Sequence, residues 1–84
     1  MNEPYSLTDH NGTVRWFLNG QMHRDDGPAV ICANGNQLWY KFGEQHRIDG
    51  PAVVLANGDK AWFLEGRNVN PLEHFILREA YVLP

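Results

Sequence analysis

The 84-residue chain has one cysteine and few basic residues, with seven Lys and Arg against ten Asp and Glu, for a formal charge of −3 at pH 7. A single cysteine allows no internal disulfide and excludes a zinc site made of four cysteines. The mild acidic balance argues against a general nucleic-acid binder, because nonspecific affinity for nucleic acid comes mainly from clustered Lys and Arg.

Long apolar runs and the common catalytic motifs are missing as well. No stretch approaches the ~18 apolar residues of a membrane span, and Met1-Asn2-Glu3-Pro4 lacks a basic region followed by an apolar run. The chain contains no glycine-rich phosphate loop, Gly-x-Ser-x-Gly elbow, dinucleotide fingerprint or His-x-x-x-His pair. We therefore expect a cytoplasmic protein that is not an enzyme and holds no cofactor or metal.

What the chain does contain is an internal repeat. Trp16, Trp39 and Trp62 are 23 residues apart, and many other residues recur at the same offset. The matching positions are Gly12, Gly35 and Gly58; Phe17, Tyr40 and Phe63; Gly20, Gly43 and Gly66; His23-Arg24 and His46-Arg47; and Asp26-Gly27-Pro28-Ala29-Val30 with Asp49-Gly50-Pro51-Ala52-Val53. A fixed period of this size indicates one supersecondary unit that stacks on copies of itself. Cys32 corresponds to Leu55 and is expected to be a small buried apolar side chain.

Turn signals between short β-prone runs predict a mainly β fold, a single-domain antiparallel meander built from hairpin repeats. Asn19-Gly20, Asn34-Gly35 and Asn57-Gly58 are expected to form type I′ turns, which need two residues with positive φ. Asp-Gly-Pro marks a second kind of turn, because proline cannot donate to a strand ladder. The expected hairpins pair 28–33 with 37–42 and 51–56 with 60–64.

A change of pattern near the C-terminus predicts a short helix. Asn70-Pro71-Leu72-Glu73 supplies an N-cap, a proline at the first helical position and an acid in the first turn. Leu72, Phe75, Ile76 and Ala80 share one helical face, which is expected to cover the last hairpin. The expected organisation is a half-repeat at 1–11, repeats at 12–34 and 35–57, a partial repeat at 58–69, and a helix and tail at 70–84.

Trp16-Phe17, Gly20, His23-Arg24 and Asp26-Gly27-Pro28-Ala29, with their second copies, resemble β-hairpin repeats of the MORN type. They resemble more closely the Trp-Tyr-x-x-Gly-x-x-His-Arg-x-Asp-Gly-Pro-Ala repeats found in proteins of bacteriophages, giant viruses and some bacteria. The resemblance extends from about Asn11 to Gly66. It implies a binding or scaffolding module, and it allows an inhibitor of a host system, a common role of phage proteins of this size.

The repeated His-Arg-x-Asp group is the candidate for chemistry, because His with a nearby carboxylate can form an acid-base pair or bind a metal. A catalytic group is normally needed once, whereas a residue that stabilises each repeat must recur. We therefore expect the aspartates to accept turn N–H bonds and the arginines to pair with them or with a neighbour. The residues assigned this structural role are His23, Arg24, Asp26, Gly27, His46, Arg47, Asp49 and Gly50. The alternative is a small metal-binding or hydrolytic protein that uses His23, Asp26, His46 and Asp49.

Two aromatic rows on opposite faces of the sheet are the candidate partner surface, because Trp and Tyr often anchor protein interfaces. The candidate residues are Trp16, Phe17, Trp39, Tyr40, Trp62 and Phe63. The resulting hypothesis is a non-enzymatic protein-binding module, a phage-encoded inhibitor or adaptor that acts on a host protein or defence system in the host-cell cytoplasm. A sheet edge could also pair with a second copy of the chain. The alternative is an RNA or single-stranded nucleic-acid binder that stacks bases on these rows near Arg15, Lys41 and Lys60.

Overall fold

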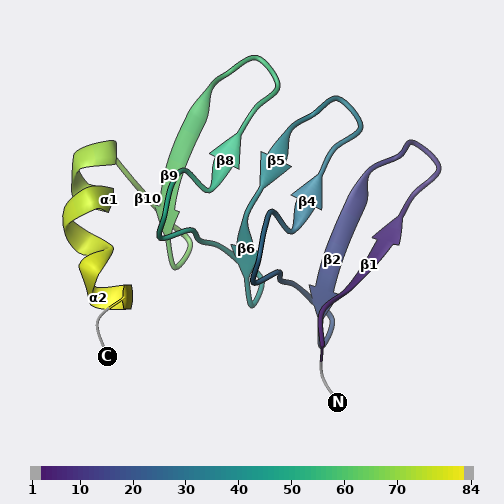
Figure 1. The fold of residues 1–84 in the computed structure, drawn as a ribbon, viewed down its shortest axis with the longest axis horizontal. Helices are drawn as coiled ribbons and strands as arrows, with labels where there is room; N and C mark the ends of the chain where they lie inside the picture. The colour runs from purple at the N-terminus through teal and green to yellow at the C-terminus, as the bar shows by residue number, and fades with distance from the viewer. Residues whose placement is uncertain (1–2, 83–84) are drawn as a thin grey trace.

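The computed structural model describes residues 3–82 and has a mainly β fold with helix only at the C-terminal end (Figure 1). The strands are β1 (Tyr5–Thr8), β2 (Val14–Leu18), β3 (Gln21–Met22), β4 (Val30–Ile31), β5 (Gln37–Leu38), β6 (Tyr40–Lys41), β7 (Glu44–Gln45), β8 (Val53–Val54), β9 (Lys60–Leu64) and β10 (Arg67–Val69), and the helices are α1 (Pro71–Leu77) and α2 (Glu79–Val82). The predicted mainly β class with a C-terminal helix is confirmed.

The main sheet is antiparallel and runs in the order β1-β2-β4-β5-β8-β9-β10. Its hairpins β1–β2, β4–β5 and β8–β9 stand side by side with their loops pointing the same way (Figure 1). Each descending strand then enters a second, short hairpin, in which β3 pairs with β2, β7 with β6 and β10 with β9. The predicted antiparallel meander is therefore present, although most of its strands are shorter than expected.

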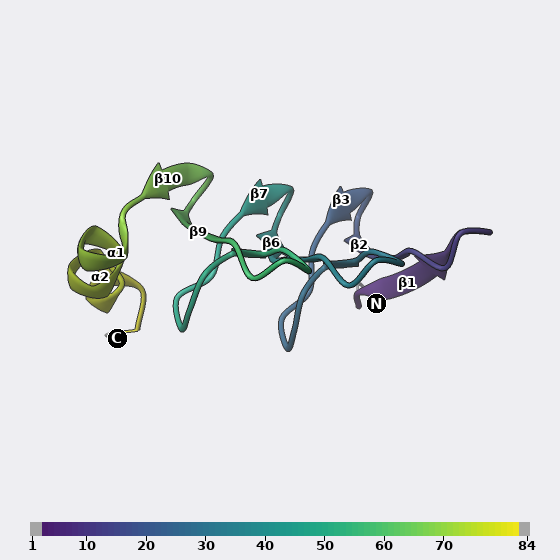
Figure 2. The same cartoon turned by 90° about the horizontal axis from the view of Figure 1, so that it is seen from above.

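Seen from above, the short hairpins and the long loops lie on opposite sides of the sheet (Figure 2). Strands β3, β7 and β10 form a row on one side, and the loops from β3 to β4 and from β7 to β8 protrude on the other. The molecule measures 39 × 36 × 17 Å, so it is a thin slab with little interior. Hydrophobic burial alone is therefore limited, because stabilisation scales with the apolar area removed from water.

The core is accordingly small. Ala29 and Ala52 are fully buried, and Val30, Leu64 and Val69 are the other buried apolar side chains among the described residues. Each of the two alanines also accepts a backbone hydrogen bond from a tryptophan of the sheet, Ala29 from Trp16 at 2.7 Å and Ala52 from Trp39 at 2.8 Å. Cys32 is only half-buried, as is its repeat counterpart Leu55, so the expectation that Cys32 is buried is wrong.

The turn types differ from the prediction at two of the three Asn-Gly pairs. Asn19-Gly20 does form a turn with two positive φ values, 51° and 81°. At Asn34-Gly35 only the glycine has positive φ, and the Gly35 N–H donates to the Cys32 carbonyl at 2.9 Å. The Asn34 side chain accepts the N–H of Asn36 at 3.0 Å, so it stabilises a three-residue loop in place of a type I′ turn.

The same three-residue loop occurs at Asn57-Gly58, where the Asn57 side chain accepts the Asp59 N–H at 2.9 Å. The other turns with two positive φ values are in the short hairpins, at Phe42-Gly43 and Glu65-Gly66. Glycine positions thus predict where the chain turns, whereas the turn type depends on how many residues separate the paired strands.

The start of the C-terminal helix is as predicted. The Asn70 side chain accepts the Glu73 N–H at 2.8 Å, the Glu73 carboxylate accepts the Asn70 N–H at 3.0 Å, and Pro71 follows the cap. This reciprocal pair is a capping box, which satisfies two backbone donors that the helix itself leaves free.

The orientation of α1 differs from the prediction. Leu72, Phe75 and Ile76 are 68%, 61% and 60% exposed, so the apolar face does not cover the last hairpin. The helix packs beside β9 through its other side, where His74 is 4% exposed and its Nε2 lies 2.5 Å from the Arg47 carbonyl oxygen. Helical periodicity identifies the side chains that share a face, but the direction of that face is set here by a polar contact.

Candidate functional site

The first His-Arg-x-Asp-Gly-Pro segment is organised around its arginine. The guanidinium carbon of Arg24 lies 4.5 Å from the ring centroid of Trp16, a cation–π distance. Its Nε donates to the Asp26 carboxylate at 3.0 Å, and its Nη1 donates to the Pro28 carbonyl at 3.2 Å. One arginine therefore joins the strand, the acidic residue and the far end of the turn.

The second segment repeats these contacts 23 residues later. Arg47 lies 3.9 Å from the ring centroid of Trp39, and it donates to the Asp49 carboxylate at 2.9 Å and to the Pro51 carbonyl at 3.1 Å. Because the same three contacts occur in both copies, they belong to the architecture of the repeat unit.

The glycine of each Asp-Gly-Pro turn lies against this arginine. A Cβ placed on Gly27 or Gly50 would lie 3.0 Å from the guanidinium carbon of Arg24 or Arg47, respectively, which is tighter than ordinary van der Waals contact. The neighbouring aspartates bind the arginine, and no bond from a turn N–H to their carboxylates occurs within residues 3–82. Of the two roles expected for these aspartates, the structure therefore shows the pairing with arginine.

The first histidine has both ring nitrogens occupied. His23 is 2% exposed, its Nδ1 accepts the backbone N–H of Phe42 at 2.9 Å, and its Nε2 lies 2.9 Å from the Asp25 carboxylate. Since Nδ1 accepts a hydrogen bond, Nε2 carries the proton and donates it to Asp25. This ring has no nitrogen left for a metal or a substrate.

The second histidine differs from the first in one contact. His46 Nδ1 accepts the Glu65 N–H at 2.9 Å, but Ile48 stands at the position of Asp25, so Nε2 has no corresponding carboxylate. Burial lowers the pKa of His46 below 6.5, which keeps the ring neutral at pH 7. The ring of Tyr81 stands edge-on to His46 with centroids 5.1 Å apart, and the Tyr81 hydroxyl donates to the Glu65 carboxylate.

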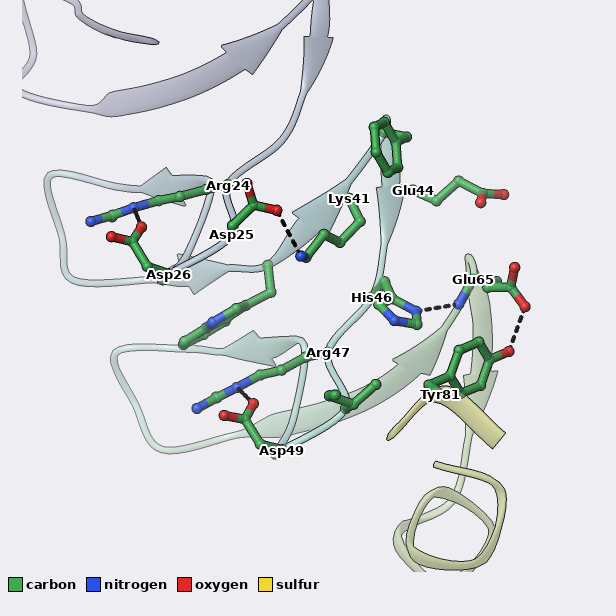
Figure 3. A pocket seen from close by; sticks show the side chains of 14 residues that line it. Arg24, Asp25, Asp26, Lys41, Glu44, His46, Arg47, Asp49, Glu65 and Tyr81 are labelled. Carbon is green, nitrogen blue, oxygen red and sulfur yellow. Dashed lines mark hydrogen bonds and ion pairs between the residues drawn. The ribbon is translucent and has the colours of Figure 1, made fainter. Parts of the chain in front are cut away.

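A groove of about 740 Å³ lies beside these residues and is lined by both arginines and by His46, but not by His23 (Figure 3). Its walls come from the loop 24–27, the β6–β7 hairpin, the segment 46–49 and, at one end, Glu65 and Tyr81. Lys41, at the centre of Figure 3, donates to Asp25 at 2.9 Å, and this bond lowers the pKa of that carboxyl group. The groove thus lies between the two repeated segments and is closed on one side by the C-terminal helix.

The six aromatic residues predicted to bind a partner are all half-buried, and the structure does not bring them together at one site. Trp39 lines the groove, and Trp16 lines a smaller hollow beside Glu3 and Pro4. Phe17 packs against Tyr5 with ring centroids 6.0 Å apart. The remaining three, Tyr40, Trp62 and Phe63, line neither hollow.

The large apolar side chains that are exposed are different ones. They are Tyr5, Leu7, Phe42, Leu72, Phe75, Ile76, Leu77 and Tyr81. Phe42 could have been singled out from the sequence, because this apolar residue stands at a turn position where the other copies have the polar residues Asn19 and Glu65. A bulky residue with φ of 50° that is also 62% exposed is unusual, and such positions often mark functional sites.

The four residues considered for a metal or hydrolytic site do not form one cluster. Asp26 and Asp49 bind their own arginines, whereas His23 binds Asp25. Within residues 3–82, no group of three or more His, Cys, Asp or Glu side chains is placed to hold a metal ion.

Comparisons with protein-family models, curated protein sequences and solved structures found no match to this chain. Neither α1 nor α2 has the length and apolar character that a membrane crossing needs.

Replacing Arg47 with alanine should lower the free energy of unfolding by about 1–2 kcal/mol, because one cation–π contact and two hydrogen bonds are lost. Denaturant unfolding measures this change. The matched control is Arg67→Ala, which removes an exposed arginine that has no ion pair within residues 3–82 and should cost less than about 0.5 kcal/mol. Equal effects of the two substitutions would contradict the role of Arg47 in the repeat.

The lowered pKa of His46 predicts that stability falls in mild acid. The unfolded chain binds a proton at its ordinary pKa of 6.5, before the folded chain does, so the stability that His46 contributes is present above pH 6.5. That contribution is lost as the pH falls from 6.5 through the lower pKa of the folded state. Urea unfolding at several pH values should therefore show a smaller pH dependence for His46→Asn than for the wild type. His10→Asn, which removes an exposed histidine, should keep the wild-type dependence, and an unchanged slope in His46→Asn would contradict the assignment.

Proposed function

We propose that this chain is a non-enzymatic protein-binding module that contacts its partner through the groove between the two repeated segments. The observation that carries the proposal is the groove itself, where Phe42 and Tyr81 present exposed aromatic surface above a wall of fixed polar side chains. Exposed aromatic side chains on a rigid support are typical anchors of protein interfaces.

The groove walls are fixed by contacts within the chain. Arg24, Arg47 and Lys41 each bind an aspartate of the chain. A general acid, base or nucleophile needs an atom free to reach a substrate. These three basic side chains are held by aspartates of the chain, which favours a role in binding over one in catalysis.

The conformation of Phe42 also supports a binding role. Its backbone has φ of 50°, and its ring packs on the buried His23 with centroids 4.3 Å apart. The ring is therefore held in place while most of its surface stays exposed. An aromatic anchor that is already immobilised loses little conformational entropy when it is buried by a partner.

A protein partner is favoured over nucleic acid by the charges of the groove. The three basic side chains that line it are paired with aspartates, and the chain as a whole has a net charge of −3. Nucleic acid requires cations that are free to meet phosphate. In keeping with the resemblance of its repeats to those of viral and bacterial proteins, we further propose that the bound protein is a host protein that this chain inhibits or recruits.

The edge of the sheet offers a second contact, in which two copies of the chain associate. Strand β1 has a single neighbour, β2, among the described residues, and all four of its residues are exposed. An exposed edge strand can pair with the edge of another sheet. Such pairing would leave the groove open, so a dimer and partner binding are compatible.

The test of the proposal is capture of partners from nuclease-treated host-cell lysate by the tagged chain and by two variants. Phe42→Asn places a residue suited to positive φ at the groove and should reduce the recovered partner about fivefold or more, as expected for an interface anchor. Leu72→Asn removes an exposed apolar side chain outside the groove and away from β1, and it should leave recovery unchanged. Circular dichroism would verify that both variants are folded. Equal recovery with both variants, or no partner at all, would contradict the proposal.

A further inference from the structure

We propose that the partner inserts a cationic side chain, an arginine or a lysine of an exposed basic segment, into the end of the groove formed by Glu44, Glu65 and Tyr81. This inference rests on the proposed function and specifies the chemistry of the partner at that site. It is based on the charges of the groove, where every basic side chain has a counter-ion among the described residues but two carboxylates do not.

Every cation of the groove has its own counter-ion. Arg24 binds Asp26, Arg47 binds Asp49, and Lys41 binds Asp25, all at 2.9–3.0 Å. These pairs use three of the five carboxylates that line the groove. The two that remain have no basic partner within residues 3–82, so the groove as a whole carries unbalanced negative charge.

The two remaining glutamates lie on neighbouring short hairpins. A Cβ placed on Gly66 would lie 3.3 Å from Oε2 of Glu44, so this carboxylate is beside the turn that contains Glu65. Figure 3 shows Glu44 and Glu65 on the same side of His46, with the Tyr81 hydroxyl bonded to Glu65. Carboxylates without a basic partner attract a cation from outside the chain.

The surroundings of this pair favour a cation from outside. His46 lines the same end of the groove and is neutral at pH 7, because burial lowers its pKa, so it supplies no positive charge. Aromatic rings of Tyr81, Phe42 and Trp39 also line the groove. Aromatic faces with nearby carboxylates are the environment in which proteins bind guanidinium and ammonium groups.

The copies of the repeat differ at the positions that build this end. Glu44 and Glu65 are on successive short hairpins, whereas the residues one repeat earlier in the sequence are Gln21 and Phe42, which carry no charge. Tyr81 comes from α2, which has no counterpart beside the first copy. The acidic and aromatic end is therefore a property of one junction and is not required by the repeat.

The experiment is a titration of the full-length, ¹⁵N-labelled chain with capped pentapeptides, followed by NMR. The probes are Gly-Gly-Arg-Gly-Gly, its lysine counterpart and its glutamate counterpart, each acetylated and amidated. The arginine and lysine peptides should shift the amide signals of Glu44 and Glu65 and the indole signal of Trp39 in a saturable way. The glutamate peptide should leave these signals unchanged.

Matched variants separate this site from the general negative charge of the chain. Glu44→Gln together with Glu65→Gln should weaken binding of the arginine peptide about tenfold, the loss expected when charge-assisted bonds become neutral ones. Asp59→Asn removes one charge at a hairpin loop, keeps a similar shape and should change the affinity less than about twofold. Glu65→Gln alone also removes one negative charge, and it should weaken binding more than Asp59→Asn does.

The inference is overturned if no peptide gives saturable shifts up to roughly 10 mM, since a single anchored side chain binds in this weak range. It is also overturned if the glutamate peptide binds equally well, or if Asp59→Asn weakens binding as much as Glu65→Gln. Each of these results leaves the proposed function standing, because the Phe42→Asn comparison measures loss of the partner whatever the charge of its contact residue.

Discussion

A hydrogen bond from a backbone N–H to a histidine ring nitrogen connects each repeated segment to the short hairpin that follows it. His23 accepts from Phe42, and His46 accepts from Glu65, in both cases through Nδ1 at 2.9 Å. The slab is too thin for a large apolar core, so the packing of neighbouring hairpins depends in part on such hydrogen bonds. These imidazoles therefore fix the spacing of the short hairpins, and the stacked arginines fix the loops on the other side of the sheet.

Beyond this shared bond, the contacts of the two histidines differ. In the first copy, Asp25 completes the contacts of the histidine and also binds Lys41 of the next copy. In the second copy Ile48 replaces that aspartate, and the C-terminal helix brings Tyr81 to the histidine instead. The groove at the junction between the second copy and the helix thus has an acidic and aromatic end, which the repeat alone does not create.

Much of the fold could be predicted from the sequence because glycine, proline and asparagine act locally. The meander and the cap at Asn70 follow from such local rules. The orientation of α1 could not be predicted, since it depends on His74 reaching the Arg47 carbonyl, a contact between distant parts of the chain. The groove was missed for the same reason. Phe42 and Glu65 occupy equivalent positions of successive repeats, but no spacing in the sequence relates them to Glu44 or to Tyr81 of α2.

The most direct test of this account is the protonation state of the two histidine rings at neutral pH, read from long-range ¹H–¹⁵N correlation spectra of the labelled chain. Both Nδ1 atoms accept a backbone N–H, so the account predicts that His23 and His46 are neutral and carry their proton on Nε2. A proton on Nδ1 of either ring would contradict it, because that ring could not accept the bond that holds the next hairpin.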